Sequence, residues 1–197
     1  MKTIIWDIDD VLNDLMKSWF EHDRRLKNTE NKIKYKDLIE NPPHRLLNIT
    51  ERQYLAALDK FRNSAAAQNM RPNPVLLRWF HLHGHEARHI ALTSRPLHTV
   101  PLLSAWVFKN FGLWIRTFAF VPCRMKKNTP LYEKNKKEYL KWLAKADILI
   151  DDSPENIKGA KESGIKGLLY PAPWNKSDIT VERLLAMLTQ QIRAKKL

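Results

Sequence analysis

Short apolar runs recur along the chain and are separated by longer segments with helical features. The first run is apolar at consecutive positions, which is typical of a strand buried on both faces of a parallel sheet. The later runs are of similar length and lie between turn-forming or polar residues. The pattern predicts strands at Thr3–Trp6, Ile90–Thr93, Thr117–Val121, Ile148–Ile150 and Gly167–Tyr170.

Helical segments lie between these runs and carry recognisable start and stop signals. The segment 73–84 begins with Asn and Pro and closes at Gly84, and the segment 100–112 also closes at Gly. The segment 153–164 opens with Ser and Pro and stops at Gly164. Pro in the first helical turn and Gly after the last are typical helix boundaries. Strands alternating with helices indicate right-handed crossovers and a mainly parallel sheet.

One stretch breaks this alternation, because the first two predicted strands are separated by far more residues than one crossover helix needs. Asp14–Leu26 has helical character, and Thr50 and Gln53 have the spacing of a capping box at the start of a second helix. We therefore predict a helical cap at 14–83, inserted after the first strand, and a catalytic core made of 1–13 and 84–197.

Length and composition favour a cytoplasmic protein with one main domain. The chain has 197 residues and one cysteine, Cys123, which excludes an internal disulfide. Asp7 interrupts the early apolar run, so no signal peptide is expected, and no run approaches the roughly 20 residues of a membrane span. We expect no membrane partner.

About half of the net charge of +13 lies in one short region. Between Arg124 and Lys145 there are eight Lys or Arg residues and two Glu. Such a segment is either a solvated surface or a field that attracts phosphorylated substrates or nucleic acid. Aromatic residues are sparse in the segment, so nucleic acid is an open partner that the sequence does not favour.

Residues with carboxylate or hydroxyl side chains lie at the carboxyl ends of three of the predicted strands. In an open parallel sheet, ligands bind at this edge. Carboxylates crowded there repel one another unless a cation is bound, and a set of oxygen ligands favours Mg²⁺. The side chains concerned are Asp7, Asp9, Thr93, Ser94, Asp151 and Asp152.

The motifs "DIDDVLND", "LTSRP", the Lys-rich segment and "ILIDDSPEN" resemble, in this order, those of the haloacid dehalogenase-like (HAD) phosphohydrolases. With the late "PAPWN", they look most similar to the 5′(3′)-deoxyribonucleotidase branch. The resemblance covers 1–13 and about 84–175, and implies a Rossmann-like, doubly wound α/β core. Asp10 departs from the branch, which usually has Gly there, and this change places a side chain beside the site.

The resemblance also implies a role for each motif residue. Asp7 would be the nucleophile that forms an aspartyl-phosphate, and Asp9 would protonate the leaving oxygen and later activate water. Thr93 and Ser94 would hold a phosphate oxygen. A lysine would neutralise charge on the phosphoryl group; Lys136 is the first choice because it starts a predicted helix.

The resemblance also implies a set of ligands for a metal ion. Mg²⁺ would be bound by Asp7, the backbone carbonyl of Asp9, and Asp151, with Asp152 supporting these ligands. Four other lysines remain alternatives to Lys136 for the contact with the phosphoryl group: Lys137, Lys134, Lys126 and Lys127.

Trp19 and Phe20 lie close in sequence to the acidic motif, on the first helix of the insert. They would either line the substrate pocket or pack inside the cap. We expect the insert to cover the carboxyl edge of the sheet and to supply at least one aromatic side chain to the pocket.

The function that these features favour is Mg²⁺-dependent hydrolysis of a phosphorylated small molecule, with a nucleotide as a candidate substrate. Two alternatives remain at this point. One is a phosphatase acting on nucleic-acid ends, and the other is a basic nucleic-acid-binding protein with an inactive core. The sequence indicates no oligomeric state.

Overall fold

Five parallel strands form one sheet, in the order β3-β2-β1-β4-β5. The computed structural model describes residues 1–22, 33–124, 127–128 and 130–194. All five predicted strands are present, with small shifts at their ends. They are β1 (Thr3–Trp6), β2 (Arg88–Arg95), β3 (Ile115–Pro122), β4 (Ile148–Asp151) and β5 (Lys166–Leu169).

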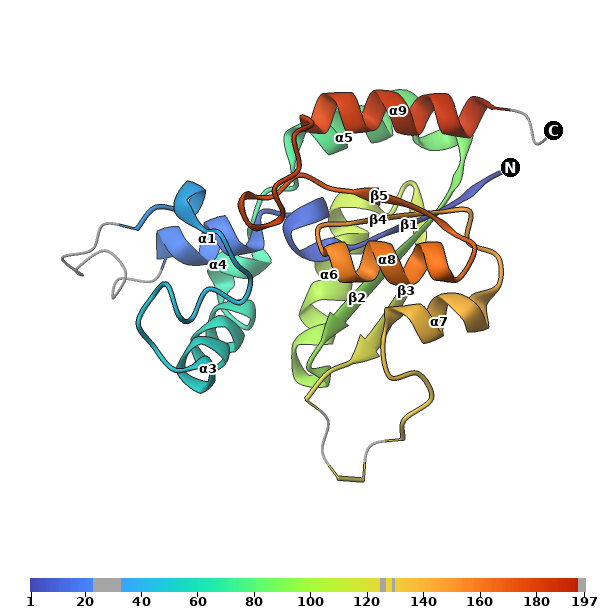
Figure 1. Cartoon of the computed structure of the whole chain (residues 1–197). Helices are drawn as coiled ribbons and strands as arrows, with labels where there is room; N and C mark the ends of the chain where they lie inside the picture. The colour runs from blue at the N-terminus through green and yellow to red at the C-terminus, as the bar shows by residue number, and fades with distance from the viewer. Residues whose placement is uncertain (23–32, 125–126, 129, 195–197) are drawn as a thin grey trace.

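Helices cover both faces of the sheet, as the alternating sequence pattern predicts (Figure 1). On one face lie α5 (Pro74–His83), α6 (Val100–Phe111) and α9 (Val181–Arg193). On the other face lie α7 (Lys136–Leu143) and α8 (Pro154–Glu162). The fold is therefore a doubly wound α/β fold.

Strand β1 shows how side-chain alternation builds the two halves of the core. Ile4 and Trp6 point to the layer of α5, α6 and α9, whereas Ile5 points to the layer of α7 and α8. All three side chains are fully buried. Because β1 is central and apolar on both faces, its carboxyl end is rigidly placed between β2 and β4.

The insert forms a helical cap beside the carboxyl ends of the strands (Figure 1). Its helices are α1 (Leu15–His22), α3 (Glu51–Arg62) and the short α4 (Ala65–Gln68). The predicted capping box is present, since the Thr50 hydroxyl accepts a hydrogen bond from the Gln53 backbone N–H at 3.2 Å. Of the helix expected at Asp14–Leu26, positions 23–26 lie outside the described residues.

The cap returns to the core one helix earlier than the predicted boundary at 83/84. Asn13 and Pro72 pair across the two connections, and the Asn73 N–H donates to the Leu12 carbonyl at 3.0 Å. Helix α5 then packs on the sheet, where Trp79 and Phe80 contact Trp6. The capping signals located this helix correctly, but its apolar side chains belong to the core rather than to the cap.

No helix in the described ranges has the length and apolar character needed to cross a bilayer. Short 3₁₀ turns complete the connections between the longer elements. The 3₁₀ turns are Tyr35–Asp37, Gly84–Glu86, Leu97–Thr99 and Pro173–Asn175.

Candidate active site

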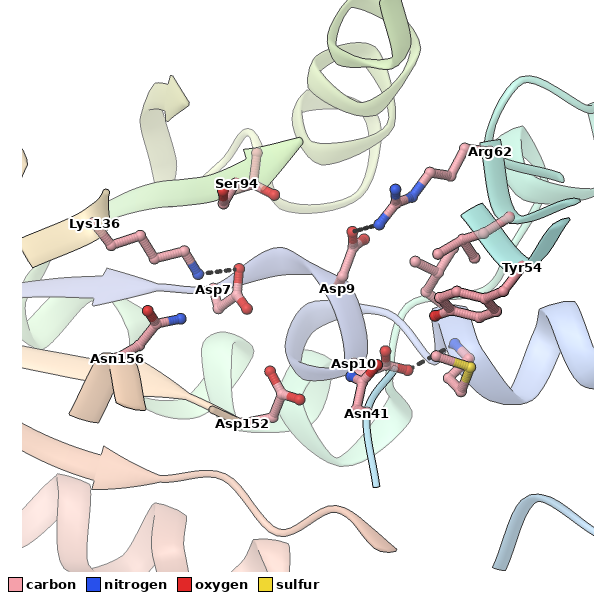
Figure 2. Close-up of a pocket in the computed structure, with 14 residues that line it drawn as sticks. Asp7, Asp9, Asp10, Asn41, Tyr54, Arg62, Ser94, Lys136, Asp152 and Asn156 are labelled. Atoms are coloured by element: carbon pink, nitrogen blue, oxygen red, sulfur yellow. Dashed lines mark hydrogen bonds and ion pairs between the residues drawn. The ribbon is translucent and has the colours of Figure 1, made fainter. Parts of the chain in front are cut away.

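A polar cavity of about 170 Å³ lies between the carboxyl edge of the sheet and the cap (Figure 2). The insert therefore covers the edge that the sequence predicts. The core contributes Asp7, Asp9, Thr93, Ser94, Lys136 and Asp152 to the cavity wall. The cap side contributes Leu15, Met16, Asn41, Tyr54, Leu58 and Arg62.

The backbone leaves the strand geometry directly after Asp7, which brings Asp7 and Asp9 to the same cavity. The Asp7 N–H still donates to the Ile150 carbonyl, at 2.9 Å, as a continuation of the sheet. Asp10 then adopts a left-handed conformation, with φ of 60°. The Asn13 side-chain oxygen accepts from the Asp10 N–H at 3.2 Å and holds this turn. The turn therefore keeps Asp9 at the end of the strand, on the wall of the same cavity as Asp7.

Lys136 lies at the centre of the acidic edge. Its Nζ lies 2.8 Å from Asp7 Oδ1 and 2.7 Å from Asp151 Oδ2. The Asn135 side chain caps α7 by accepting from the Glu138 N–H, which fixes Lys136 as the first residue of the helix. Burial alone would lower the pKa of Lys136, but the charges of Asp151 and Asp7 raise it above its ordinary value. The ammonium group therefore stays protonated at neutral pH.

Among the described residues, the other lysines considered do not reach this position. Lys137 pairs with Glu162 on α8, and Lys134 and Lys127 are exposed. Lys126 lies outside the described residues. The geometry thus places Lys136 in the cavity, while its contact with phosphate stays a prediction.

Asp7, Asp151 and Asp152 form a buried acid cluster, with carboxylate oxygens all within 4.8 Å of one another. Asn156 donates to both carboxylate oxygens of Asp151, at 3.0 and 3.1 Å. The Trp174 indole N–H donates to Asp152 Oδ2 at 2.8 Å, so Trp174 orients a site carboxylate. Buried carboxylate oxygens at this separation fit a bound Mg²⁺ ion. Asp152 lies within this cluster, and the supporting role that the resemblance implies for it stays a prediction.

Burial and mutual repulsion disfavour the charged forms of Asp7 and Asp152 in the acid cluster. Burial raises the pKa of Asp7 well above its ordinary value, and the charges of Asp151 and Asp152 add to this effect against the attraction of Lys136. Burial and the charge of Asp151 likewise raise the pKa of Asp152 to about 7. A divalent cation would relieve both effects because it favours the charged form of each acid.

The raised pKa of Asp152 predicts how stability depends on pH in chelator-treated protein. Between pH 4 and 7 the folded protein retains a proton that the unfolded chain has released, so Asp152 makes folding less favourable as the pH rises. Asp152→Asn should therefore gain stability relative to the parent as the pH increases from 5 to 8. Urea unfolding of both proteins measures this difference, and a difference that does not change with pH contradicts the prediction.

Asp9 is held by two arginines that the sequence analysis assigned no role. Arg95, at the end of β2, donates through Nε to Asp9 Oδ2 at 2.6 Å and through Nη2 to Oδ1. Arg62, on cap helix α3, places Nη2 3.4 Å from Asp9 Oδ2 (Figure 2). Burial opposes ionisation, but the charges of Arg95 and Arg62 outweigh it and hold the pKa of Asp9 below its ordinary value. The side chain is therefore present as a carboxylate.

Thr93 and Ser94 end strand β2 beside the acidic motif, and both line the cavity. Thr93 is buried and Ser94 is exposed. Their location agrees with the expected position of phosphate ligands, and their role stays a prediction.

Trp19 and Phe20 are not among the residues that line the cavity, so of the two alternatives the structure favours packing inside the cap over a place in the substrate pocket. Both are buried in the interior of the cap, where Trp19 contacts Phe20 and Tyr54 edge to face. Within the described part of the cap, Tyr54 is the aromatic residue that lines the cavity. Their closeness in sequence to the acidic motif could not decide between the two alternatives, because the neighbours of a side chain depend on tertiary packing.

Comparison with solved structures gives the class of fold. A haloacid dehalogenase-like hydrolase family protein from Streptococcus pneumoniae matches with a TM-score of 0.64 and 12% identity, covering 97% of this chain and 98% of that one. A haloacid dehalogenase-like protein of unknown function from Agrobacterium tumefaciens matches with a TM-score of 0.62 and 12% identity, over 97% of each chain.

A third match is the HAD-type hydrolase YfnB from Bacillus subtilis, in a magnesium-bound form. Its TM-score is 0.60 at 15% identity, covering 98% of this chain and 99% of that one. No protein-family model matches the chain, and no curated protein matches it. The chain therefore has the fold of HAD-like hydrolases, and the shared fold extends over the cap as well as the core.

Proposed function

We propose that this protein is a Mg²⁺-dependent phosphomonoester hydrolase of the HAD type. The observation that carries the proposal is the convergence of Asp7, Lys136 and Asp151 at the carboxyl edge of the sheet, beside Asp152. A carboxylate nucleophile, a fixed cation and a metal-binding cluster are the components needed to transfer a phosphoryl group. The fold shared with HAD-like hydrolases supports the same conclusion.

Asp7 acts as the nucleophile in this proposal. One of its carboxylate oxygens attacks phosphorus, the bond from phosphorus to the ester oxygen breaks, and an aspartyl-phosphate forms. Lys136 is close enough to Asp7 to neutralise negative charge on both the carboxylate and the phosphoryl group. Thr93 and Ser94 orient the phosphate oxygens from the end of β2. Mg²⁺ held by the acid cluster would supply further charge neutralisation when bound.

Asp9 serves the proton transfers on the opposite side of the phosphorus. Its contacts with Arg95 and Arg62 favour the carboxylate, which is the form that activates water to hydrolyse the aspartyl-phosphate. Protonation of the leaving oxygen in the first step requires Asp9 to take up a proton. The longer contact, to Arg62, is the one that most easily loosens for this step.

A nucleotide is the candidate substrate. This part of the proposal is supported by the motifs "DIDDVLND" and "IDDSPENI", which resemble those of the 5′(3′)-deoxyribonucleotidase branch. The cap faces the cavity with both apolar and hydrogen-bonding side chains, which suits a nucleoside leaving group.

Phosphate release from a panel of phosphomonoesters, including 5′- and 3′-nucleotides, sugar phosphates and p-nitrophenyl phosphate, tests the proposal. We expect Mg²⁺-dependent turnover of at least one compound and a preference for nucleotides. Absence of turnover across the panel in Mg²⁺ contradicts phosphatase activity, and turnover that excludes nucleotides contradicts only the nucleotide assignment.

The net charge of +13 favours a second candidate, a phosphatase acting on nucleic-acid ends. Two cations of the basic segment form ion pairs within the protein. Lys136 binds the acid cluster, and Arg124 pairs with Asp59 of the cap at 2.8 Å. Strong, salt-sensitive binding of 5′-phosphorylated oligonucleotides, with turnover faster than that of mononucleotides, would favour this second function.

A further inference from the structure

Tyr54, on cap helix α3, carries a hydroxyl group that the proposed mechanism does not use. Its side chain is buried and forms part of the cavity wall. Figure 2 shows the hydroxyl pointing toward Asp10, into the space between the cap and the core. Within the described part of the chain, this hydroxyl has no hydrogen-bond partner, and it is not enclosed by the protein. It is therefore available to a ligand in the cavity.

The ring of Tyr54 is fixed by the interior of the cap, which gives the hydroxyl a defined position. The ring meets Trp19 edge to face, with ring centroids 5.4 Å apart and an interplanar angle of 85°. The Tyr54 N–H donates to the Thr50 carbonyl at 3.0 Å, in the capped first turn of α3. Burial raises the pKa of Tyr54 above its ordinary value, so the hydroxyl keeps its proton and can donate it in a hydrogen bond. A donor held in place binds a ligand at a lower cost in entropy than a mobile one.

Tyr54 belongs to a face of α3 that lines the cavity with side chains at intervals of four residues: Tyr54, Leu58 and Arg62. Residues four apart lie on the same face of a helix. Arg62 Nε is buried and lacks an acceptor, and its Nη2 makes only a long contact with Asp9, at 3.4 Å. This face of α3 therefore has a hydrogen-bond donor at each end that the protein leaves partly or wholly unsatisfied, with an apolar side chain between them.

The position of this face indicates which part of a substrate it would meet. In Figure 2, Asp9 lies between Asp7 and the cap residues Tyr54 and Arg62. In the proposed mechanism the phosphoryl group lies beside Asp7, so the cap residues meet the leaving group. An oxygen acceptor on the leaving group can pair with the Tyr54 hydroxyl, while its carbon atoms pack on Leu58.

We propose that Tyr54 is a specificity-determining residue, whose hydroxyl donates a hydrogen bond to an oxygen acceptor on the leaving group. The inference rests on the proposed function, because it places the leaving oxygen beside Asp9. The substrate class is a phosphomonoester of an uncharged alcohol that combines an apolar body with a carbonyl or ether oxygen. A nucleoside belongs to this class, whereas a purely hydrocarbon alcohol does not.

Two compounds of similar shape test this: 4-acetylphenyl phosphate and 4-isopropylphenyl phosphate, in which a methyl group replaces the carbonyl oxygen. Their intrinsic reactivities differ, so the informative quantity is the change in the ratio of their kcat/KM values between the parent and a variant. Tyr54→Phe should lower the acetyl-to-isopropyl ratio by roughly fivefold, the contribution of one uncharged hydrogen bond. The corresponding 3-substituted pair places the acceptor at a second ring position, and at least one of the two pairs should show this loss.

The variant and its control separate specificity from folding. Tyr54→Phe keeps the ring contact with Trp19 and loses no hydrogen bond within the described protein, so its urea unfolding should match that of the parent. Tyr132→Phe makes the same change at an exposed position outside the cavity wall and should leave the ratios unchanged. A hydroxyl that served the fold, for example through Asp10, would make Tyr54→Phe less stable and leave both ratios as in the parent. Equal ratios in the parent and Tyr54→Phe for both pairs overturn the inference.

Binding measurements keep the inference separate from the proposed function. Calorimetry on Asp7→Asn, with and without Tyr54→Phe, should show that the hydroxyl raises the affinity for an acetyl compound relative to its isopropyl partner in the absence of turnover. If this difference is seen but the parent hydrolyses none of the compounds, the proposed function fails and the inference stands. If the parent hydrolyses them and Tyr54→Phe changes neither the kinetic nor the affinity ratio, the inference fails and the proposed function stands.

Discussion

Asp7→Asn is expected to lower turnover of any phosphomonoester by on the order of 10⁴-fold or more, since the amide cannot attack phosphorus. The fold should remain intact. Burial and neighbouring acids already disfavour the charge of Asp7, so a neutral side chain of the same shape relieves repulsion with Asp151 and Asp152 while it loses the ion pair with Lys136. Steady-state turnover and thermal unfolding of the purified variant measure the two effects.

A matched control and a chemical readout make this result specific. Asp178→Asn changes an exposed acid outside the cavity wall and should retain parental turnover. Acid-quenched mass spectrometry of the parent during turnover should show a phosphoryl adduct on the peptide that contains Asp7. Parental turnover by Asp7→Asn, or a phosphoryl adduct on another residue, would show that Asp7 is not the nucleophile.

The strands and their flanking helices were predictable because their signals are local. The apolar run at Thr3–Trp6 reflects burial on both faces, and the turn residues around each helix set its ends. Asn73 caps α5 by accepting from the Val75 and Leu76 N–H groups, and Ser153 caps α8 in the same way through the Asn156 N–H. Each of these contacts joins residues only two or three positions apart.

The boundary of the cap was not predictable from such signals. Leu76, Trp79 and Phe80 give α5 an apolar face, but that face fits either a cap or a sheet. Its partner on the sheet, Trp6, is distant in sequence. The same reason explains why the sequence left two alternatives for Trp19, which is buried among residues of the cap.

Some residues of the candidate site could likewise be predicted from the sequence, and others could not. Asp7, Thr93 and Asp151 could be predicted to meet because the carboxyl ends of adjacent parallel strands share an edge. Arg62 lies at the last turn of a cap helix, where a basic residue is ordinary, and its contact with Asp9 depends on how the cap packs. Asp59 shows the same dependence, since its contact with Arg124 joins the cap to the end of β3.

These cap contacts form a chain of ion pairs that reaches the candidate site. Asp59 pairs with Arg124 from the core and with Arg62 from its own helix, and Arg62 in turn reaches Asp9. The cap is therefore connected to the core by ion pairs that end at a proposed catalytic acid. A cap that excludes water while it orders Asp9 would protect the aspartyl-phosphate until the leaving alcohol departs.

Chelation is expected to abolish turnover, and Mg²⁺ to restore it and raise the unfolding temperature. The physical reason is the acid cluster, in which burial and mutual repulsion raise the pKa of Asp7 and Asp152. A ligand present at 100 times its Kd stabilises the folded state by about 2.7 kcal/mol. For a chain of this length, that corresponds to an increase of roughly 5 to 10 °C. Activity assays and thermal unfolding with and without chelator measure both effects.

A variant of the cluster separates specific binding from a general salt effect. Asp151→Asn removes one ligand charge and should lose most of the Mg²⁺-induced increase in unfolding temperature, whereas the exposed Asp178→Asn should retain it. An equal increase in Asp151→Asn and the parent would place the metal elsewhere. Full turnover in excess chelator would contradict the mechanism itself, because Lys136 alone would then balance the charges of Asp7, Asp151 and the phosphoryl group.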